Sequence, residues 1–349
     1  MSETNKTPWD ELMRPTGTPD ENSLRLAELA VRRVIEVGGT EARPFLQAIL
    51  TQDIEAIENG TGRFAALCSA KGRALGFLRV VADGDRFLLV TRSDLAASLL
   101  KRLQMYVLRR DVQLALHEDQ SAFGLIWPAD TTAGDCPLSD PAACEIIDRL
   151  TRTESQPGRL PAAVDASGRL YLREDQGNGL RIAIHGPVVE LVPLVQDTRG
   201  TTTVSAADWD RAEIEDHLPE VTGETVEHYV PQWINLDELD AFSLKKGCYP
   251  GQEVIARLHY LGKPNRQLFK GHVLGIDPPA AGTPVTNADG QSAGEVVRSA
   301  PLADGSGSLV LSVIRLKHLH DPLIIDGLPL ALDPQNTLKD SHQQAEARH

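Results

Sequence analysis

A chain of 349 residues is long for a single hydrophobic core and predicts two or three domains. The hydrophobic share of 41% and the charged share of 24% are typical of a soluble globular protein. The net charge of −14 argues against broad electrostatic capture of nucleic acid, and no apolar run approaches the roughly 18 residues that a membrane span needs.

The N-terminal residues 1–23 are polar and acidic, and we expect them to form a loose segment. They lack the apolar core of an export signal and the Arg-rich, acid-poor composition of a mitochondrial leader, so we expect a cytoplasmic protein. The four cysteines contain no C-x-x-C pair. This spacing predicts neither a disulfide framework, nor a structural zinc site, nor a permanently held iron–sulfur cluster.

The first half of the chain alternates strand and helix signals. We expect strands over residues 33–37, 63–69, 74–81, 86–90 and 112–116, and helices over 41–50 and 94–106, the second capped by Ser93. The order β-α-β-β-β-α-β is a ferredoxin-like split pattern with one extra strand, which predicts an α+β domain over residues 24–120.

A second block begins near Ser121. Strands are expected over residues 122–127, 160–164, 169–173 and 180–184, helices over 142–150 and 187–195, and an interior linker over 151–158. Ser205 then begins a helix over 206–217 that carries Trp209.

Short strands with turn residues between them follow, over 268–274, 294–298 and 308–316, and predict a small antiparallel β-barrel within residues 263–332. The polar, Gln-rich tail 333–349 is expected to be disordered.

The densest motif lies at residues 245–257, which read Lys-Lys-Gly-Cys-Tyr-Pro-Gly-Gln-Glu-Val-Ile-Ala-Arg. Pro250 suits the first position of a helix. The free N–H groups of such a helix start, beside two lysines, predict an anion-binding site. A helix start next to Lys246 also lowers the pKa of a thiol such as Cys248. Taken singly, the glycines are turn residues, the lysines a solvated corner, and a lone cysteine an inert apolar residue.

The charges around this motif are uneven. One acid, Glu253, stands among six cations, which are Lys245, Lys246, Arg257, Lys263, Arg266 and Lys270. Such a basic island is able to bind a polyanionic ligand or an acidic partner, or is simply a solvated segment.

Residues 246–253 resemble the signature K-G-C-Y-x-G-Q-E of the folate-binding YgfZ proteins. These are relatives of the glycine-cleavage T protein and include a mitochondrial iron–sulfur assembly factor. The flanking Pro231-Gln232, Asn235-Leu236, Arg257 and Asn265-Arg266 also look like family positions, and so, more weakly, do Phe45-Leu46-Gln47, Thr51, Asp53 and the segment 68–72.

The resemblance implies a T-protein-like α+β fold. Two ferredoxin-like units, 24–120 (completed by about 200–262) and 121–199, and the C-terminal barrel at 263–332 would enclose a central channel. Residues 200–262 would supply a return helix and the signature loop at the mouth of this channel.

The implied function is that of a folate-binding accessory protein for iron–sulfur cluster assembly or repair, and thereby for tRNA modification such as methylthiolation. The cofactor would be tetrahydrofolate or a derivative. The partners would be iron–sulfur assembly proteins or cluster enzymes such as tRNA methylthiotransferases, without strong direct binding of nucleic acid or membrane.

Cys248 would be the reactive thiol, and no metal ligands are expected. The residues implied for folate and the signature loop are Trp209, Lys246, Gly247, Tyr249, Gly251, Gln252, Glu253, Arg257 and Asp53. Trp209 would stack on the pterin, or else be an ordinary core residue.

The alternative is a folate-dependent aminomethyl transferase, in which Asp53 or Glu253 would handle the proton. Nucleotide-binding and catalytic-metal motifs are missing from the sequence.

Overall fold

The computed structural model describes residues 8–16, 23–128, 136–154, 156–177, 179–196, 198, 200–262 and 264–334. The chain forms two compact units whose segments alternate along the sequence. The first unit contains residues 1–43, 57–63 and 79–209, and the second contains 44–56, 64–78 and 210–349. Two predictions, on Lys263 and on the tail from residue 335, concern residues outside the described ranges.

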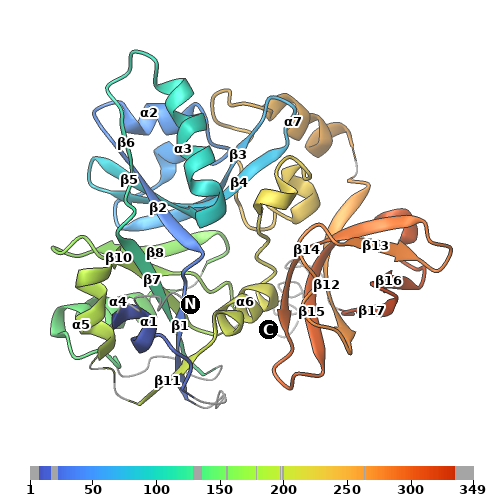
Figure 1. Cartoon of the computed structure of the whole chain (residues 1–349). Helices are drawn as coiled ribbons and strands as arrows, with labels where there is room; N and C mark the ends of the chain where they lie inside the picture. The colour runs from blue at the N-terminus through green and yellow to red at the C-terminus, as the bar shows by residue number, and fades with distance from the viewer. Residues whose placement is uncertain are drawn as a thin grey trace, which may run out of the picture. The chain divides into compact units, whose positions relative to one another are not determined.

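The same order of strands and helices occurs twice in the chain (Figure 1). The first run is β2 (Arg32–Gly38), α2 (Ala42–Gln47), β3 (Thr61–Cys68), β4 (Ala74–Asp83), β5 (Arg86–Arg92), α3 (Ser93–Val107) and β6 (Gln113–Leu116). The second is β7 (Gln120–Ile126), α4 (Pro141–Arg152), β8 (Arg159–Val164), β9 (Leu170–Arg173), β10 (Arg181–Pro187), α5 (Val188–Gln196) and β11 (Thr201–Val204). The prediction of two ferredoxin-like runs is confirmed, and the second run also has an extra strand, β11, that was not predicted.

The strands of both runs belong to one 11-stranded sheet with the order β11-β1-β7-β10-β9-β8-β3-β4-β5-β2-β6. Each run therefore orders its strands in the same way, outward from the β3–β8 pair. The one interruption is β1 (Leu24–Glu28), which lies between β7 and β11 and pairs parallel with β11. The structural repeat leaves no visible repeat in the sequence, because each run needs only the apolar pattern and not particular residues.

Three elements at the N-terminal side and the sheet edge were not predicted. Residues 8–12, within the segment expected to be loose, form helix α1 (Pro8–Leu12), and Trp9 and Met13 are buried. The strands β1 and β11 were also missed, because each has only four or five residues and depends on its partner strands. The expected cap of α3 is wrong as well. Arg92 is the N-cap residue, and the backbone N–H of Ser93 donates to the Val31 carbonyl.

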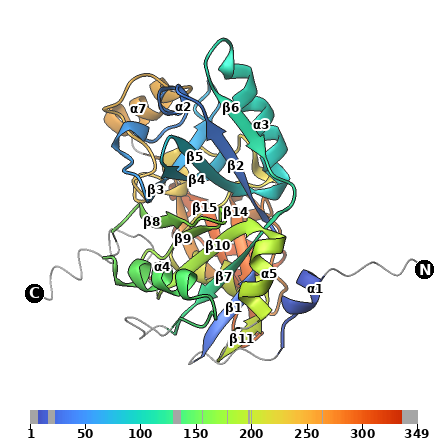
Figure 2. The same ribbon diagram turned by 90° about the vertical axis from the view of Figure 1, so that its left-hand side faces the viewer.

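Helices α1, α4 and α5 cover one face of the first unit's strands β1, β7, β9 and β10 (Figures 1 and 2). The apolar core of this layer includes Phe123, Ile147, Ile182 and Leu191. A separate cluster contains Ala122, Ala183 and Trp209, the last from the first turns of α6 (Ala206–Glu215).

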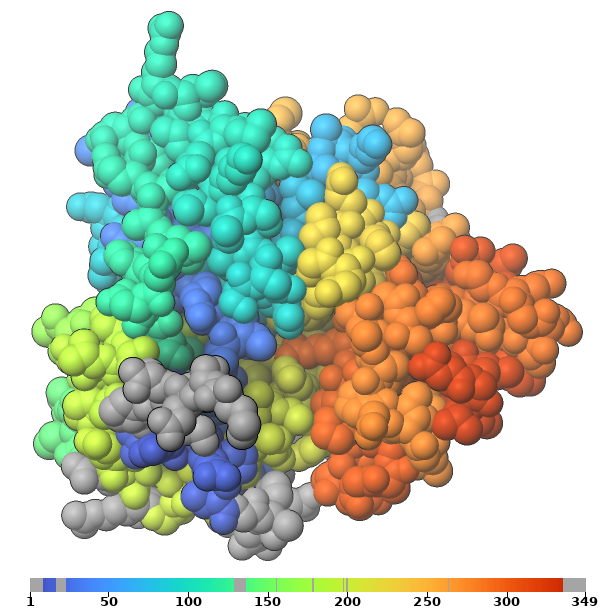
Figure 3. Space-filling model, viewed as in Figure 1, coloured from blue at the N-terminus to red at the C-terminus, as the bar shows by residue number. Residues whose placement is uncertain are grey.

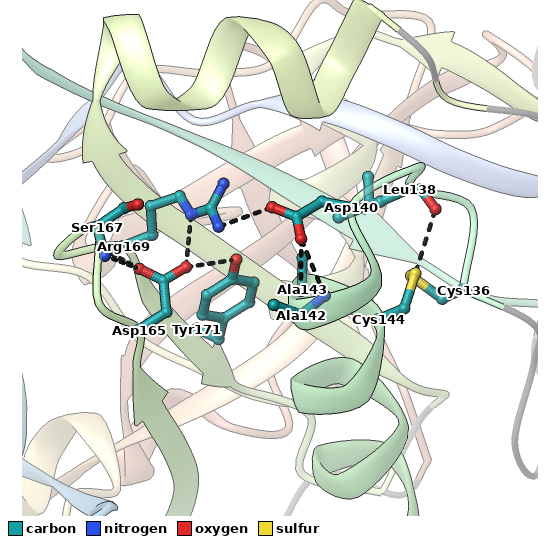
Figure 4. Close-up of polar contacts among 10 residues, drawn as sticks. All are labelled: Cys136, Leu138, Asp140, Ala142, Ala143, Cys144, Asp165, Ser167, Arg169 and Tyr171. Carbon is teal, nitrogen blue, oxygen red and sulfur yellow. Dashed lines mark hydrogen bonds and ion pairs between the residues drawn. A yellow bond between two sulfur atoms is a disulfide. The ribbon is translucent and has the colours of Figure 1, made fainter.

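The N-terminus of α4 is fixed by a polar network (Figure 4). Asp140 caps the helix by accepting from the N–H groups of its first turn, and its other oxygen accepts from Arg169 at 2.9 Å. Asp165 accepts from Arg169 and from the Tyr171 hydroxyl.

Cys136 and Cys144 beside this network form a disulfide with a Cα–Cα distance of 5.3 Å. The expectation of no disulfide is therefore wrong. The loop and the first turn of α4 bring together two cysteines whose spacing alone is not diagnostic.

The second unit contains the C-terminal barrel, drawn orange to red in the space-filling view (Figure 3). Its strands are β12 (Arg266–Leu274), β13 (Pro284–Asn287), β14 (Ser292–Pro301), β15 (Gly307–Arg315), β16 (Leu323–Ile325) and β17 (Leu328–Leu332). They close in the order β12-β15-β14-β13-β16-β17 around a core that includes Val273, Val296, Val310 and Ile314. The predicted antiparallel barrel is confirmed.

Besides parts of α2, β3, β4 and α6, the second unit contains a set of short helices joined by loops. These are η1 (Ile54–Ala56), η2 (Gly223–Thr225), η3 (Pro231–Ile234), α7 (Gln252–Leu261) and η4 (Leu316–His318). None of the helices in the described ranges combines the length and the apolar character needed to cross a membrane.

Candidate functional site

Two glycine turns of the second unit form the base of the signature loop. Gly72, in the turn between β3 and β4, has a φ of +68°, and Gly251 has a φ of +81°. A Cβ on Gly251 would lie 2.5 Å from the Gly72 Cα and 2.6 Å from the Ser69 carbonyl oxygen. A side chain fits at neither position, because a Cβ on Gly72 would meet Val254 at 2.8 Å. The weak family segment 68–72 and the signature are thus in direct contact.

Helix α7 begins at Gln252, two residues later than predicted. Gly251 is its N-cap residue and Pro250 lies outside the helix, so the assignment of Pro250 to the first helical position is wrong. The positive φ at Gly251 makes the turn into the helix, which no residue with a side chain adopts easily. The carbonyl of Gly251 then accepts from Val254 and Ile255. Ile255 is the fully buried residue of this helix.

Lys246 reaches into the loop that follows α2. Its ammonium donates to the Leu50 carbonyl at 2.8 Å and to the Gln52 carbonyl at 2.5 Å, and it lies 5.4 Å from the centre of the Tyr249 ring. Burial lowers the pKa of Lys246 to about 8, against the opposing effect of Asp53 and Glu55. The ammonium therefore joins two segments far apart in the sequence. Its contacts are with backbone carbonyls, which differs from the expected anion-binding role.

The segment of Gln47, Thr51 and Asp53 supports the same loop. Gln47 donates to Asp53 at 2.9 Å and accepts from the backbone of Ile54. The Thr51 hydroxyl donates to the Ala241 carbonyl at 2.7 Å. Gln47 and Asp53 therefore bind each other and hold the loop that receives Lys246.

Cys248 stands at the exposed part of the loop. It is a free thiol, and Gly247 before it has open space where a Cβ would be. Tyr249 after it is buried, and burial, together with the neighbouring Cys68, raises the pKa of its hydroxyl. Burial also raises the pKa of Cys68 to about 12, so Cys68 stays a protonated, enclosed thiol. The exposed Cys248 thus lies between Gly247, which has open space beside it, and the buried ring of Tyr249.

The start of α7 shows two kinds of contact. Glu253 and Arg257 form an ion pair at 2.8 Å whose side chains are 85% and 67% exposed, a geometry that contributes little stability. Gln232 donates to the Ile255 carbonyl at 2.8 Å and thereby fixes the buried side of the helix. The backbone N–H of Gln252 donates to the Tyr249 carbonyl.

The basic island does not form one patch. Lys246 is bound to carbonyls, Arg257 is paired with Glu253, and Lys270 is paired with Glu215. Arg266 instead packs on Trp233 at the end of the barrel. Because these cations have separate partners, the expectation of a single binding site for a polyanion is not supported.

Trp209 occupies a core position of the first unit. It is 1% exposed, and a Cβ on Gly124 would lie 2.2 Å from its ring. The guanidinium groups of Arg32 and Arg181 each lie 5.7 Å from the ring centre. Its indole N–H is buried and has no acceptor within the described residues. The packed ring leaves little free face for stacking on a ligand.

Two groups of residues were missed by sequence reasoning. In the first unit, Glu174 is fully buried and pairs with Arg32 at 2.5 Å and with Arg79 at 2.9 Å. In the second unit, Arg73 stacks on Trp233. For the second group, the sequence offers one signal, the Trp that directly follows Pro231-Gln232. For the first group it offers no signal, because isolated charges within apolar strands have no recognisable pattern. Across the described ranges, no three His, Cys, Asp or Glu side chains gather in a way that could hold a metal.

The fold defines the class of protein. A crystal structure of the glycine cleavage system aminomethyltransferase T from Bartonella henselae matches with a TM-score of 0.69. The match covers 96% of this chain and 97% of that chain at 15% sequence identity. The chain thus has the aminomethyltransferase T fold, and at this identity the match shows the fold alone.

Sequence relatives are more specific. A protein of Colwellia psychrerythraea is 27% identical over 70% of both chains, and one of Escherichia fergusonii is 25% identical over 85% of this chain and 90% of its own. A relative from Sodalis glossinidius is 27% identical over 81% of this chain. All three bear the name tRNA-modifying protein YgfZ. No protein-family model matches the chain. The resemblance to the YgfZ family that the signature indicates is confirmed.

Proposed function

We propose that this chain is a folate-binding accessory protein of the cytoplasm that supports tRNA modification by helping to assemble or repair iron–sulfur clusters in enzymes such as tRNA methylthiotransferases. The fold of an aminomethyltransferase supports a link to folate, and the name of the relatives supports a link to tRNA modification. A reduced folate would supply one-carbon or redox chemistry; the residues of this chain would bind it and present a thiol.

The observation that carries the proposal is the way in which Cys248 is presented. Lys246 is bound to two carbonyls, Tyr249 is buried, and the backbone of Gly251 is packed against another turn. Only Gly247 and Cys248 between these anchors are exposed. A loop anchored this tightly on both sides presents its thiol in a fixed position, which suits transient contact with sulfur, iron or a partner's thiol.

The residues proposed for folate divide into two roles. Trp209 would hold the ligand through its unpartnered N–H. Lys246, Gly251, Gln252 and Asp53 would act as positioning residues, because their contacts are with the protein itself. Glu253 and Arg257 pair on the surface of α7. The central channel implied by the resemblance stays a prediction.

The alternative, a one-carbon transferase, needs a carboxylate free to handle a proton. Asp53 accepts from Gln47, and Glu253 is 85% exposed and paired with Arg257. Both carboxylates are thus engaged by groups of the chain itself, and neither is placed to exchange a proton with a bound folate. The accessory role is therefore favoured over turnover.

The test is a calorimetric titration of the protein with a stable reduced folate, followed by an assay of amine-dependent folate turnover. We expect saturable binding without turnover, and binding weakened by about 0.5–1.5 kcal/mol in Trp209→Phe, the range for the one hydrogen bond that this change removes. Trp127→Phe, at another buried tryptophan of the first unit, is the control. Absence of binding at millimolar folate would show that folate is not the ligand. Turnover with an aminomethyl donor would overturn the accessory role.

The role of the thiol is tested in cells. In a strain that lacks the protein, Cys248→Ala should fail to restore the activity of an iron–sulfur tRNA methylthiotransferase, whereas Lys245→Ala, at an exposed neighbour outside the proposed site, should restore it. Full rescue by Cys248→Ala would remove the thiol from the proposal while leaving folate binding untouched.

A further inference from the structure

A second polar site lies in the second unit, at the end of the barrel. It is a depression of about 450 Å³ whose wall includes Lys71, Arg73 and Arg266 as well as Glu227, Glu295 and Trp233. This volume falls within the range of small-molecule sites. Cations and carboxylates both line it, so that it offers donors and acceptors to one ligand.

Trp233 is the flat centre of this site. The guanidinium carbon of Arg73 lies 4.6 Å from the ring centre and that of Arg266 lies 4.5 Å from it. Arg73 is held further by donating to the His228 carbonyl at 2.7 Å. Stacking of this kind fixes planar guanidinium groups while leaving N–H edges for a ligand.

Arg73, Arg266 and Arg315 lie close together although their positive charges repel one another. Arg266 on β12 lies directly opposite Arg315 on β15 in the antiparallel register, a like-charge pair that weakens a sheet. Burial lowers the pKa of Arg266, and the nearby Arg315 and Arg73 lower it further, with Glu295 opposing. Arg266 makes no salt bridge within the described part of the chain, and the Arg315 Nε is buried without an acceptor there. A cost of this kind is offset when an anion binds.

We propose that Arg73 and Arg266, with Trp233, form a binding site for a single nucleotide, either free or as one unstacked nucleotide of an RNA strand. The arginines pair with its phosphate, because the guanidinium fork matches phosphate oxygens. The base stacks on the guanidinium–indole surface, as bases do on Arg and aromatic planes.

The carboxylates favour a nucleotide over a bare anion. Glu227 and Glu295 on the same wall accept hydrogen bonds from amino groups of a base, and they would only repel a simple polyanion. The net charge of −14 opposes a long phosphate footprint and is compatible with one local contact. The site involves neither folate nor Cys248 and stands apart from the proposed function.

The experiment is a calorimetric titration at fixed low salt with 5′-AMP, adenosine, inorganic phosphate, triglutamate and a five-nucleotide single-stranded RNA. We expect saturable binding of 5′-AMP, and adenosine, phosphate and triglutamate each at least about tenfold weaker, because each lacks the phosphate or the base. RNA binding at least about tenfold tighter than 5′-AMP identifies an RNA strand as the source, and equal affinity identifies a free nucleotide. Adenosine or triglutamate binding as tightly as 5′-AMP would overturn the proposal.

Variants separate the site from general charge. Arg266→Gln and Arg73→Gln should each weaken 5′-AMP binding about tenfold or more, whereas Arg109→Gln, an exposed arginine after α3, should leave it unchanged. Arg266→Gln removes one charge of the repulsive Arg266–Arg315 pair, so its melting temperature should equal or exceed that of the parent chain. A folded Arg266→Gln protein with unchanged nucleotide affinity would overturn the assignment.

Discussion

Gly72 and Gly251 lie backbone against backbone, so that a Cβ added to Gly251 would be 2.5 Å from the Gly72 Cα. The two residues are far apart in the sequence, and both have a positive φ. This contact fixes the start of α7 against the β3–β4 turn and therefore sets the position of the loop that carries Cys248. The signature glycine at 251 is explained by sterics alone, before any ligand is considered.

Gly251→Ala should destabilise the protein by about 2–4 kcal/mol, because the new methyl group meets backbone and the residue must hold a left-handed conformation. Gly247→Ala, in open space four residues earlier, should change the free energy of unfolding by less than about 0.5 kcal/mol. Denaturant unfolding measures both. Equal stability of the two variants would contradict the packing seen here.

Lys246→Met should lower the free energy of unfolding by about 1–3 kcal/mol at neutral pH, because two buried carbonyls lose a charged donor. Denaturant unfolding of the variant and the parent chain at pH 7 measures this loss. Lys245→Met, at the exposed neighbour, serves as the control and should have almost no effect.

The pH dependence of Lys246 has a defined sign. Burial lowers its pKa from 10.5 to about 8 in the native chain, so between these values the unfolded chain binds more protons. Stability from this group therefore rises with pH across that window. The difference in unfolding free energy between the parent chain and Lys246→Met should grow from pH 8 to pH 10.5. A constant difference would contradict the lowered pKa.

A thiol-specific disulfide reagent should modify one thiol per native chain rapidly, because Cys248 is exposed while Cys68 is buried with a pKa of about 12. The number of rapidly modified thiols per native chain should fall to zero in Cys248→Ser. It should rise to two in denaturant, when Cys68 is released, and to four after reduction of the Cys136–Cys144 disulfide. Two fast thiols in the native chain would show that Cys68 is accessible.

Gly124→Ala should cost about 2–3 kcal/mol of stability, because its Cβ would lie 2.2 Å from the Trp209 ring. Trp209→Phe makes room at that position, so the double variant should be more stable than the sum of the two single changes predicts. A double-mutant cycle by thermal unfolding measures this coupling. Strict additivity would show that the ring is free to move away from β7.

Much of the fold could be predicted, because its elements have local causes. Apolar alternation gave the long strands of both ferredoxin-like runs, and helical spacing gave α3, α4 and α5. The short strands β1, β11, β13, β16 and β17 were missed, since three to five residues have little propensity of their own and are held by their neighbours. The disulfide was missed for a similar reason, since a loop brings Cys136 to α4.

The signature residues could be found in the sequence, but their roles could not. The motif identified the family resemblance and singled out Cys248, which the structure places in solvent. Contacts decided the rest: Lys246 reaches carbonyls about 195 residues away, Trp209 is enclosed against Gly124, and Arg266 meets Arg315 and Trp233. Local sequence sets secondary structure because neighbouring residues interact in any conformation. A side chain's partner is chosen only when the fold brings distant segments together, and the tertiary structure alone makes that choice.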